Sequence, residues 1–153
     1  MRAASVANRS QRLRWLFDRR YATAGQLGAR AFTANGSYTD AGGIVYHASF
    51  LRFAERGRSE WLRENGINNS DLLPGHGFHF VVRHIAIDYL TPGRLDDLLE
   101  VQTSVVDLGN ASFTMQQNIT RDGTAVASMK VVLVCINEAG KAVRIPDMLR
   151  AIL

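Results

Sequence analysis

The sequence predicts an α+β fold in which one long α-helix packs against an antiparallel β-sheet of about five strands. Residues 45–65 place apolar side chains at intervals of three and four residues, which is the spacing of one face of a helix. Residues 80–136 contain four apolar, β-rich segments separated by turn-forming residues. A chain of 153 residues with 46% hydrophobic content is long enough to bury a core between these elements.

The predicted helix has an apolar face and a charged face. The apolar face, which we expect to pack against the core, consists of Tyr46, Phe50, Phe53, Ala54, Gly57 and Trp61. The charged face, which we expect in solvent, consists of Arg52, Glu55, Arg56, Ser59 and Arg63. Gly66 should end the helix, because glycine readily adopts the left-handed conformation that follows a last helical turn.

The β-rich part contains four predicted strands, at residues 80–90, 98–106, 112–119 and 125–136. The breaks between them hold the turn formers Pro92 and Gly93, Gly109 and Asn110, and Asp122 and Gly123. Residues 68–77 form a predicted loop. A fifth strand is expected around residues 31–38, although Asn35 and Gly36 weaken it. Because one helix cannot cover both faces of such a sheet, we expect the chain to dimerise.

The positive charge of the chain is concentrated at its start. Residues 1–30 hold seven arginines and one aspartate, whereas residues 31–153 hold 11 basic and 13 acidic side chains. Since the body is slightly acidic, no nucleic-acid partner is expected. We predict that residues 1–30 are a basic N-terminal extension, disordered or a short helix, with a targeting or membrane-surface arm as the alternative. Residues 31–153 are predicted to form a single domain.

The cysteine and histidine content excludes several classes of site. Cys135 is the only cysteine, so no internal disulfide or cysteine metal cluster can form, which fits a reducing compartment such as the cytoplasm. The longest aliphatic run, residues 131–136, is too short to cross a bilayer, and we predict no transmembrane segment. We also predict no metal site, because His76, His79 and His84 lack a ligand spacing with any acidic partner.

A carboxylate precedes the predicted helix. Asp40 lies in a loop with Gly42 and Gly43, and the helix is predicted to begin near His47. A helix N-terminus offers unpaired amide groups and the positive end of the dipole, which together can stabilise an oxyanion. A nearby carboxylate can activate water as a general base or attack a carbonyl directly. The alternative is an aspartate that only caps the helix or braces the loop.

Residues 38–66 have the sequence YTDAGGIVYHASFLRFAERGRSEWLRENG. This segment resembles the signature of the 4-hydroxybenzoyl-CoA thioesterase family, and most closely its Tol-Pal-associated acyl-CoA thioesterase branch, the YbgC-like proteins. The likeness continues through FVVRHIAIDYLTPGRLDDLLEVQT and VVLVCINEAGKAVRIP, so it covers residues 38–147. It implies a hotdog fold, in which the sheet wraps around the helix, and hydrolysis of an acyl-CoA or acyl carrier protein thioester.

The resemblance also implies the site and its partners. It assigns the catalytic carboxylate to Asp40 and the helix-start role to His47, whose backbone amide is the expected contributor, with its side chain as the alternative. The remaining candidates are Val81, Val82 and Arg83 for the acyl pocket across a dimer interface, and Asn110 and Ser112 for CoA. Either Arg83 or Arg94 could pair with a phosphate. No cofactor is implied beyond the CoA of the substrate, and the expected assembly is a homodimer or homotetramer.

Several alternatives stay open. Glu60, at the edge of the apolar stripe, is a second possible carboxylate, whereas helical phase argues against Glu55. The chain departs from the family pattern at Tyr38, where an acid is usual, at Phe50, where tyrosine is frequent, and in residues 108–112, which lack an arginine. Other functions to consider are a hotdog dehydratase or hydratase, and a non-catalytic acyl-CoA-binding or scaffold protein with an envelope-complex partner bound through residues 1–30.

Overall fold

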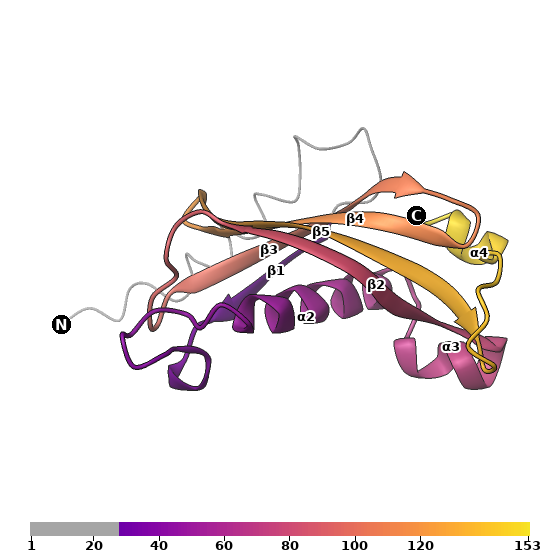
Figure 1. Cartoon of the computed structure of the whole chain (residues 1–153), viewed down its shortest axis with the longest axis horizontal. Helices are drawn as coiled ribbons and strands as arrows, with labels where there is room; N and C mark the ends of the chain where they lie inside the picture. Colours follow the sequence, from indigo (N-terminus) through magenta and orange to yellow (C-terminus); the bar gives the residue numbers. More distant parts are fainter. Residues whose placement is uncertain (1–27) are drawn as a thin grey trace.

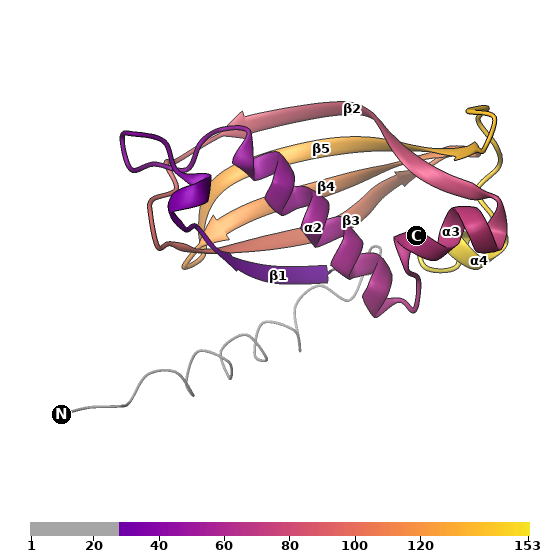
Figure 2. The same cartoon turned by 90° about the horizontal axis from the view of Figure 1, so that it is seen from below.

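The computed structural model describes residues 28–153. In this part of the chain, a curved five-stranded antiparallel sheet covers one long helix, α2 (Ser49–Glu64), as Figure 1 shows. The strands lie in the order β1-β3-β4-β5-β2. Figure 2 shows α2 running obliquely beneath the sheet, with β1 at one edge and β2 at the other. The predicted α+β architecture is confirmed.

The four strands after the helix are confirmed, with bounds that differ from the predicted ones by at most two residues. They are β2 (Phe78–Tyr89), β3 (Leu98–Leu108), β4 (Ser112–Arg121) and β5 (Thr124–Asn137). Asp122 and Gly123 have φ angles of 48° and 80° and connect β4 to β5 in a two-residue hairpin turn. Half-buried and fully buried residues alternate along β4, so the two faces of the sheet differ, and the buried face packs on the helix side.

The first strand differs from its prediction. Strand β1 runs over Gly28–Thr33, earlier than the expected residues 31–38, and pairs with β3. The side chain of Asn35 accepts a hydrogen bond from the amide of Ser37 at 3.0 Å, and this cap begins the short 3₁₀ helix η1 (Gly36–Tyr38). The last residues of the predicted extension therefore belong to the sheet, and the rest of that extension lies outside the described residues.

Helix α2 begins two residues after the predicted start. Its buried face includes Phe50, Phe53 and Trp61, as predicted, but Tyr46 precedes the helix and is 49% exposed. Gly66, with a φ of 77°, follows its C-terminus as predicted.

Two helices were missed in the sequence. The predicted loop at residues 68–77 contains helix α3 (Asn69–His76), which buries Leu72 and ends at Gly77 in the left-handed conformation. A short helix, α4 (Asp147–Arg150), buries Leu149. No helix within residues 28–153 is long and apolar enough to cross a membrane.

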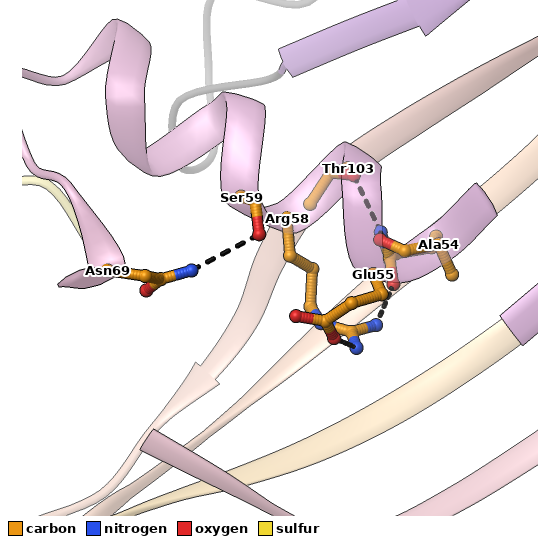
Figure 3. A network of polar contacts seen from close by, with 7 residues as sticks. Ala54, Glu55, Arg58, Ser59, Asn69 and Thr103 are labelled. Atoms are coloured by element: carbon orange, nitrogen blue, oxygen red, sulfur yellow. Dashed lines mark hydrogen bonds and ion pairs between the residues drawn. The ribbon is translucent and has the colours of Figure 1, made fainter. Parts of the chain in front are cut away.

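A buried polar layer joins α2 to the sheet (Figure 3). The side-chain amide of Gln117, on β4, donates to the carbonyl of Ala54 and to the hydroxyl of Thr103, both at 2.9 Å. Its oxygen accepts from the guanidinium of Arg58 at 2.7 Å, and Arg58 also pairs with Glu55. Gln117 and Arg58 are 0% and 6% exposed. Because these buried hydrogen bonds join groups of α2 to side chains of the sheet, the layer fixes the rotation of α2 relative to the sheet.

Candidate active site

Asp40 lies at the tip of a short main-chain hairpin that leads directly into α2. The amide of Tyr46 donates to the carbonyl of Tyr38 at 2.8 Å, and the amide of Asp40 donates to the carbonyl of Ile44 at 2.9 Å. The turn is closed by the amide of Gly43, which donates to the carbonyl of Asp40 at 3.0 Å. Gly43 has a φ of 74°, which explains a glycine at this position.

The carboxylate of Asp40 is exposed and also braces the turn. Its Oδ1 atom accepts a hydrogen bond from the amide of Gly42 at 2.8 Å, whereas its Oδ2 atom has no partner among the described residues. The loop-bracing role considered above is therefore present in the structure. It uses one oxygen and leaves the second oxygen open to solvent, so bracing and chemistry are compatible in one carboxylate.

The start of α2 presents open main-chain donors next to this hairpin. Ser49 anchors the first turn, because its amide donates to the carbonyl of Tyr46 at 2.8 Å and its hydroxyl donates to the carbonyl of Tyr38 at 3.3 Å. Within residues 28–153, the amides of His47 and Ala48 donate to no other protein group. No side chain in the described part of the chain caps the helix. These amides and the helix dipole favour negative charge at this point.

The side chain of His47 is exposed and lies among aromatic rings. Its ring centroid is 4.4 Å from that of Tyr46 and 6.3 Å from that of Tyr89, which meets it edge-on. The hydroxyl of Tyr89 donates to the main-chain carbonyl of His47 at 3.1 Å. Tyr89 is the last residue of β2, so the far end of the edge strand contacts the start of the helix.

A pocket of about 260 Å³ opens beside the helix start. Its walls come from the hairpin, the first turn of α2 and the loop after β2, and they include His47, Phe50, Tyr89 and Pro92. The loop after β2 is joined to the hairpin, because the amide of Val45 donates to the carbonyl of Gly93 at 2.7 Å. Asp40 does not line this pocket in a single copy of the chain.

The predicted acyl-pocket residues lie on β2, away from Asp40. Val82 is 43% exposed and lines a second pocket of about 290 Å³ between α2, α3 and the sheet. Val81 pairs with Val134 and is half-buried. Arg83 is exposed and occupies a β-bulge, because the register passes from Val82 opposite Leu133 to His84 opposite Val132.

The β3–β4 turn, which holds the predicted CoA contacts, lies at the opposite end of the sheet from the segment that precedes α2 (Figure 1). Asn110 is exposed in the β3–β4 turn, and Ser112 begins β4 opposite Val134. The turn is held by the C-terminal segment, since the guanidinium of Arg150 donates to the carbonyl of Gly109 at 2.8 Å. One copy of the chain thus brings Asp40 and His47 into one region and leaves the other candidates apart from them.

The two carboxylates of α2 considered as alternatives to Asp40, Glu60 and Glu55, both form ion pairs. Glu60 pairs with Arg63 at 2.6 Å and also with Arg30, so its charge is already used in surface ion pairs. Glu55 is mostly exposed, as helical phase predicted, but it pairs with Arg58 and lines the larger pocket. Arg58 was not predicted as a buried residue. Its position between Ala54 and Trp61 on the apolar stripe was the available signal.

Within residues 28–153, no group of three or more His, Cys, Asp or Glu side chains is close enough to hold a metal ion.

Asp97, in the loop after β2, accepts hydrogen bonds at 2.7 Å from the amide of Arg94 and from the guanidinium of Arg121. Burial alone would raise the pKa of Asp97, but these bonds and the two positive charges outweigh it, so the pKa lies below its ordinary value.

Comparisons with known proteins give a consistent answer. The sequence profile of the thioesterase-like superfamily matches residues 36–153. The acyl-CoA thioesterase YbgC of Haemophilus influenzae is 39% identical over 99 residues, which are 65% of this chain and 73% of that protein. The acyl-CoA thioester hydrolase YbgC of Escherichia coli O6:H1 is 39% identical over 100 residues, which are 65% and 74% of the two chains. A crystal structure of a probable thioesterase from Bartonella henselae matches with a TM-score of 0.76 at 39% identity, over 79% of this chain and 100% of that one.

Proposed function

We propose an acyl-CoA thioesterase function from the premise that the chain belongs to the thioesterase-like superfamily. Within that superfamily it is a thioester hydrolase of the YbgC-like branch, and it has the hotdog fold. The proposed reaction is the hydrolysis of an acyl-CoA to a free acid and CoA. Acyl carrier protein thioesters are a second proposed substrate class, because their reacting thioester group is the same.

The observation that carries the proposal is the junction of the hairpin and α2. An exposed carboxylate with one free oxygen, on Asp40, is tied through Tyr38 to the helix start, where the amides of His47 and Ala48 are open. When the carbonyl oxygen of a thioester accepts a hydrogen bond from the amide of His47, the carbonyl carbon becomes more electrophilic. The amide also stabilises the negative charge that develops on the oxygen. Such a donor typically contributes about 3 to 4 kcal/mol to the transition state.

In the general-base route, Asp40 removes a proton from water as the water oxygen attacks the thioester carbon. The tetrahedral intermediate then collapses, the C–S bond breaks, and the proton held by Asp40 passes to the departing thiolate. In the nucleophilic route, a carboxylate oxygen of Asp40 attacks the same carbon, CoA leaves, and water hydrolyses the resulting anhydride. Mass spectrometry after rapid quenching of a single turnover distinguishes these routes, because only the second adds an acyl mass to the peptide containing Asp40.

A homodimer would complete the site. Within residues 28–153, strand β2 is at the edge of the sheet and pairs only with β5, so in this part of the chain one row of its main-chain groups is open to a second copy. If two copies join β2 to β2 antiparallel about a two-fold axis, the Tyr89 end of one strand meets the Phe78 end of the other. Asn110, Ser112 and the larger pocket of one copy would then approach the Asp40 end of its partner. This arrangement supports the proposed roles of Val82 in the acyl pocket and of the β3–β4 turn in CoA binding.

The decisive test compares Asp40→Asn with Asp40→Ala in the full chain. Asparagine keeps an oxygen that accepts from the amide of Gly42 but removes the charge, whereas alanine removes both. We expect Asp40→Asn to retain the wild-type melting temperature and to lose at least about 100-fold in kcat on a panel of acyl-CoAs. The measurement is release of free CoA thiol. Cys135 will contribute little background to a thiol reagent because it is buried and burial raises its pKa.

The opposite pattern supports a non-catalytic role. If Asp40→Asn is fully active and only Asp40→Ala is impaired, the carboxylate braces the turn and the catalytic assignment is wrong. If the wild-type protein binds CoA but hydrolyses no acyl-CoA of any chain length, the acyl-CoA-binding or scaffold role replaces the enzyme. Hydration of an enoyl-CoA without thioester cleavage would instead identify a dehydratase or hydratase.

A further inference from the structure

The hydroxyl of Tyr89 reaches across the fold to the peptide group that begins the helix. It donates to the carbonyl of His47 at 3.1 Å, between residues 42 positions apart in the sequence. The ring has a separate role, because it packs at 5.7 Å, centroid to centroid, against Phe50, which is 3% exposed. Tyr89 is 48% exposed and His47 is also exposed, so this hydrogen bond is not needed to satisfy a buried polar group.

The carbonyl of His47 belongs to the same peptide group as the amide of Ala48. A hydrogen bond accepted by a peptide carbonyl polarises that peptide and strengthens its N–H as a donor, by about 10 to 30% in condensed-phase values. It also fixes the plane in which the N–H points. The amide of Ala48 is one of the open donors at the helix start, and within residues 28–153 no side chain caps this helix. The Tyr89 hydroxyl is thus the side-chain group, within residues 28–153, that holds this peptide.

We propose that Tyr89 is a positioning residue of the oxyanion hole, holding the His47–Ala48 peptide so that the amide of Ala48 acts as a second donor beside that of His47. The inference rests on the proposed thioesterase function. Tyr89 acts through the peptide and not on the substrate, so its hydroxyl should matter most when negative charge develops on the carbonyl oxygen. Preorganised donors of this kind lower the barrier because they need no reorientation during the reaction.

The test is Tyr89→Phe, which removes the hydroxyl and keeps the ring against Phe50. Tyr46→Phe is a matched control, because Tyr46 is 49% exposed, also lies beside the His47 ring, and lines neither pocket. We expect Tyr89→Phe to lower kcat by about 5- to 30-fold, less than the loss of a whole oxyanion donor, with KM within about two-fold. Tyr46→Phe should change neither. Binding of an S-alkyl-CoA thioether, which lacks the carbonyl oxygen, should be the same in all three proteins.

Each other result overturns the inference in a recognisable way. Wild-type kcat in Tyr89→Phe, together with an inactive Asp40→Asn, removes the role of Tyr89 and leaves the proposed function intact. A raised KM and weaker thioether binding at unchanged kcat make Tyr89 a substrate contact. Equal losses in Tyr89→Phe and Tyr46→Phe, or a lowered melting temperature that accounts for the loss, make the effect structural. Absence of hydrolysis by the wild-type protein ends the proposed function itself.

Discussion

Asp97 shows how one side chain supports the site without lining it. Its carboxylate accepts from the amide of Arg94 and from the guanidinium of Arg121, which closes the loop between β2 and β3 onto β4. The same loop contributes Gly93, whose carbonyl accepts from Val45 in the hairpin. The ion pair is mostly buried, with side chains 19% and 28% exposed. Asp97 is therefore expected to stabilise both the loop and the backbone behind Asp40.

We predict that Asp97→Asn lowers the free energy of unfolding at pH 7 by about 1 to 2 kcal/mol, the contribution of a charged hydrogen bond. Because the pKa of Asp97 is lower in the folded protein than its ordinary value of 3.8, the unfolded chain binds this proton more tightly. The contribution is thus complete above about pH 4 and is lost as the pH falls through the folded pKa. Urea unfolding of both proteins from pH 7 to pH 3 should show the difference narrowing only below about pH 4.

The control for this prediction is Asp107→Asn, an exposed carboxylate on β3 for which the described residues provide no ion pair. It should leave the unfolding free energy at pH 7 within about 0.5 kcal/mol of wild type. A difference between wild type and Asp97→Asn that is constant from pH 7 to pH 3 would contradict the assigned cause, because loss of packing does not titrate.

At the scale of elements, the close approach of α2 to the sheet depends on a glycine in the middle of the helix. A Cβ atom at Gly57 would lie 2.9 Å from a methyl carbon of Val101 and 3.4 Å from the side chains of Gln117 and Thr103. Val101 is 0% exposed and cannot move into solvent. The side chain of Gln117 at this contact also accepts from Arg58, so the glycine sets the distance at which that bond forms.

We predict that Gly57→Ala destabilises the protein by about 1 kcal/mol. Alanine should gain about 1 kcal/mol in helix propensity, but overpacking against Val101 costs about 1 to 3 kcal/mol. Gly75→Ala is the matched control, since Gly75 lies inside α3 with nothing within 4 Å of its added Cβ, and it should be neutral or stabilising. Denaturant unfolding of the two variants measures both effects. A Gly57→Ala protein more stable than wild type would show that the sheet yields easily at this contact.

The parts of the fold that the sequence predicts correctly are those determined by residues close to one another along the chain. Asp40, Gly42 and Gly43 form a local turn, and the alternation of the strands is likewise local, so both were predictable. Helix α3 was missed because Pro74 and the glycines that follow it resemble a loop, whereas the burial of Leu72, a tertiary contact, decides the outcome. Arg58 and Tyr89 act on partners 59 and 42 residues away, and no periodicity reports such contacts.

At the scale of the whole molecule, the exposed edge of β2 is the feature that one copy leaves unexplained. The strand has the burial pattern of a half-covered surface, with Val82 and Tyr89 exposed, and its outer main-chain groups are open. A long edge strand of this kind invites pairing with another strand, and a two-fold antiparallel pairing would satisfy it without further growth. The midpoint of Phe78–Tyr89 falls at Arg83 and His84, so Val82 of the two copies would lie close to the axis.

We predict that Val82→Asp converts the proposed homodimer to a monomer and abolishes thioester hydrolysis together with it. Two like charges near a two-fold axis in a partly desolvated interface cost several kcal/mol, which raises the dissociation constant by more than about 100-fold. Sedimentation velocity of the full chain across a concentration series is the measurement. Val106→Asp is the control, because Val106 is 54% exposed on the inner strand β3, and it should remain dimeric and active. A Val82→Asp protein that stays dimeric would move the interface to another face. A monomer with undiminished kcat would show that one copy holds the complete site, so that Val82 and the β3–β4 turn of a partner are not needed for the reaction.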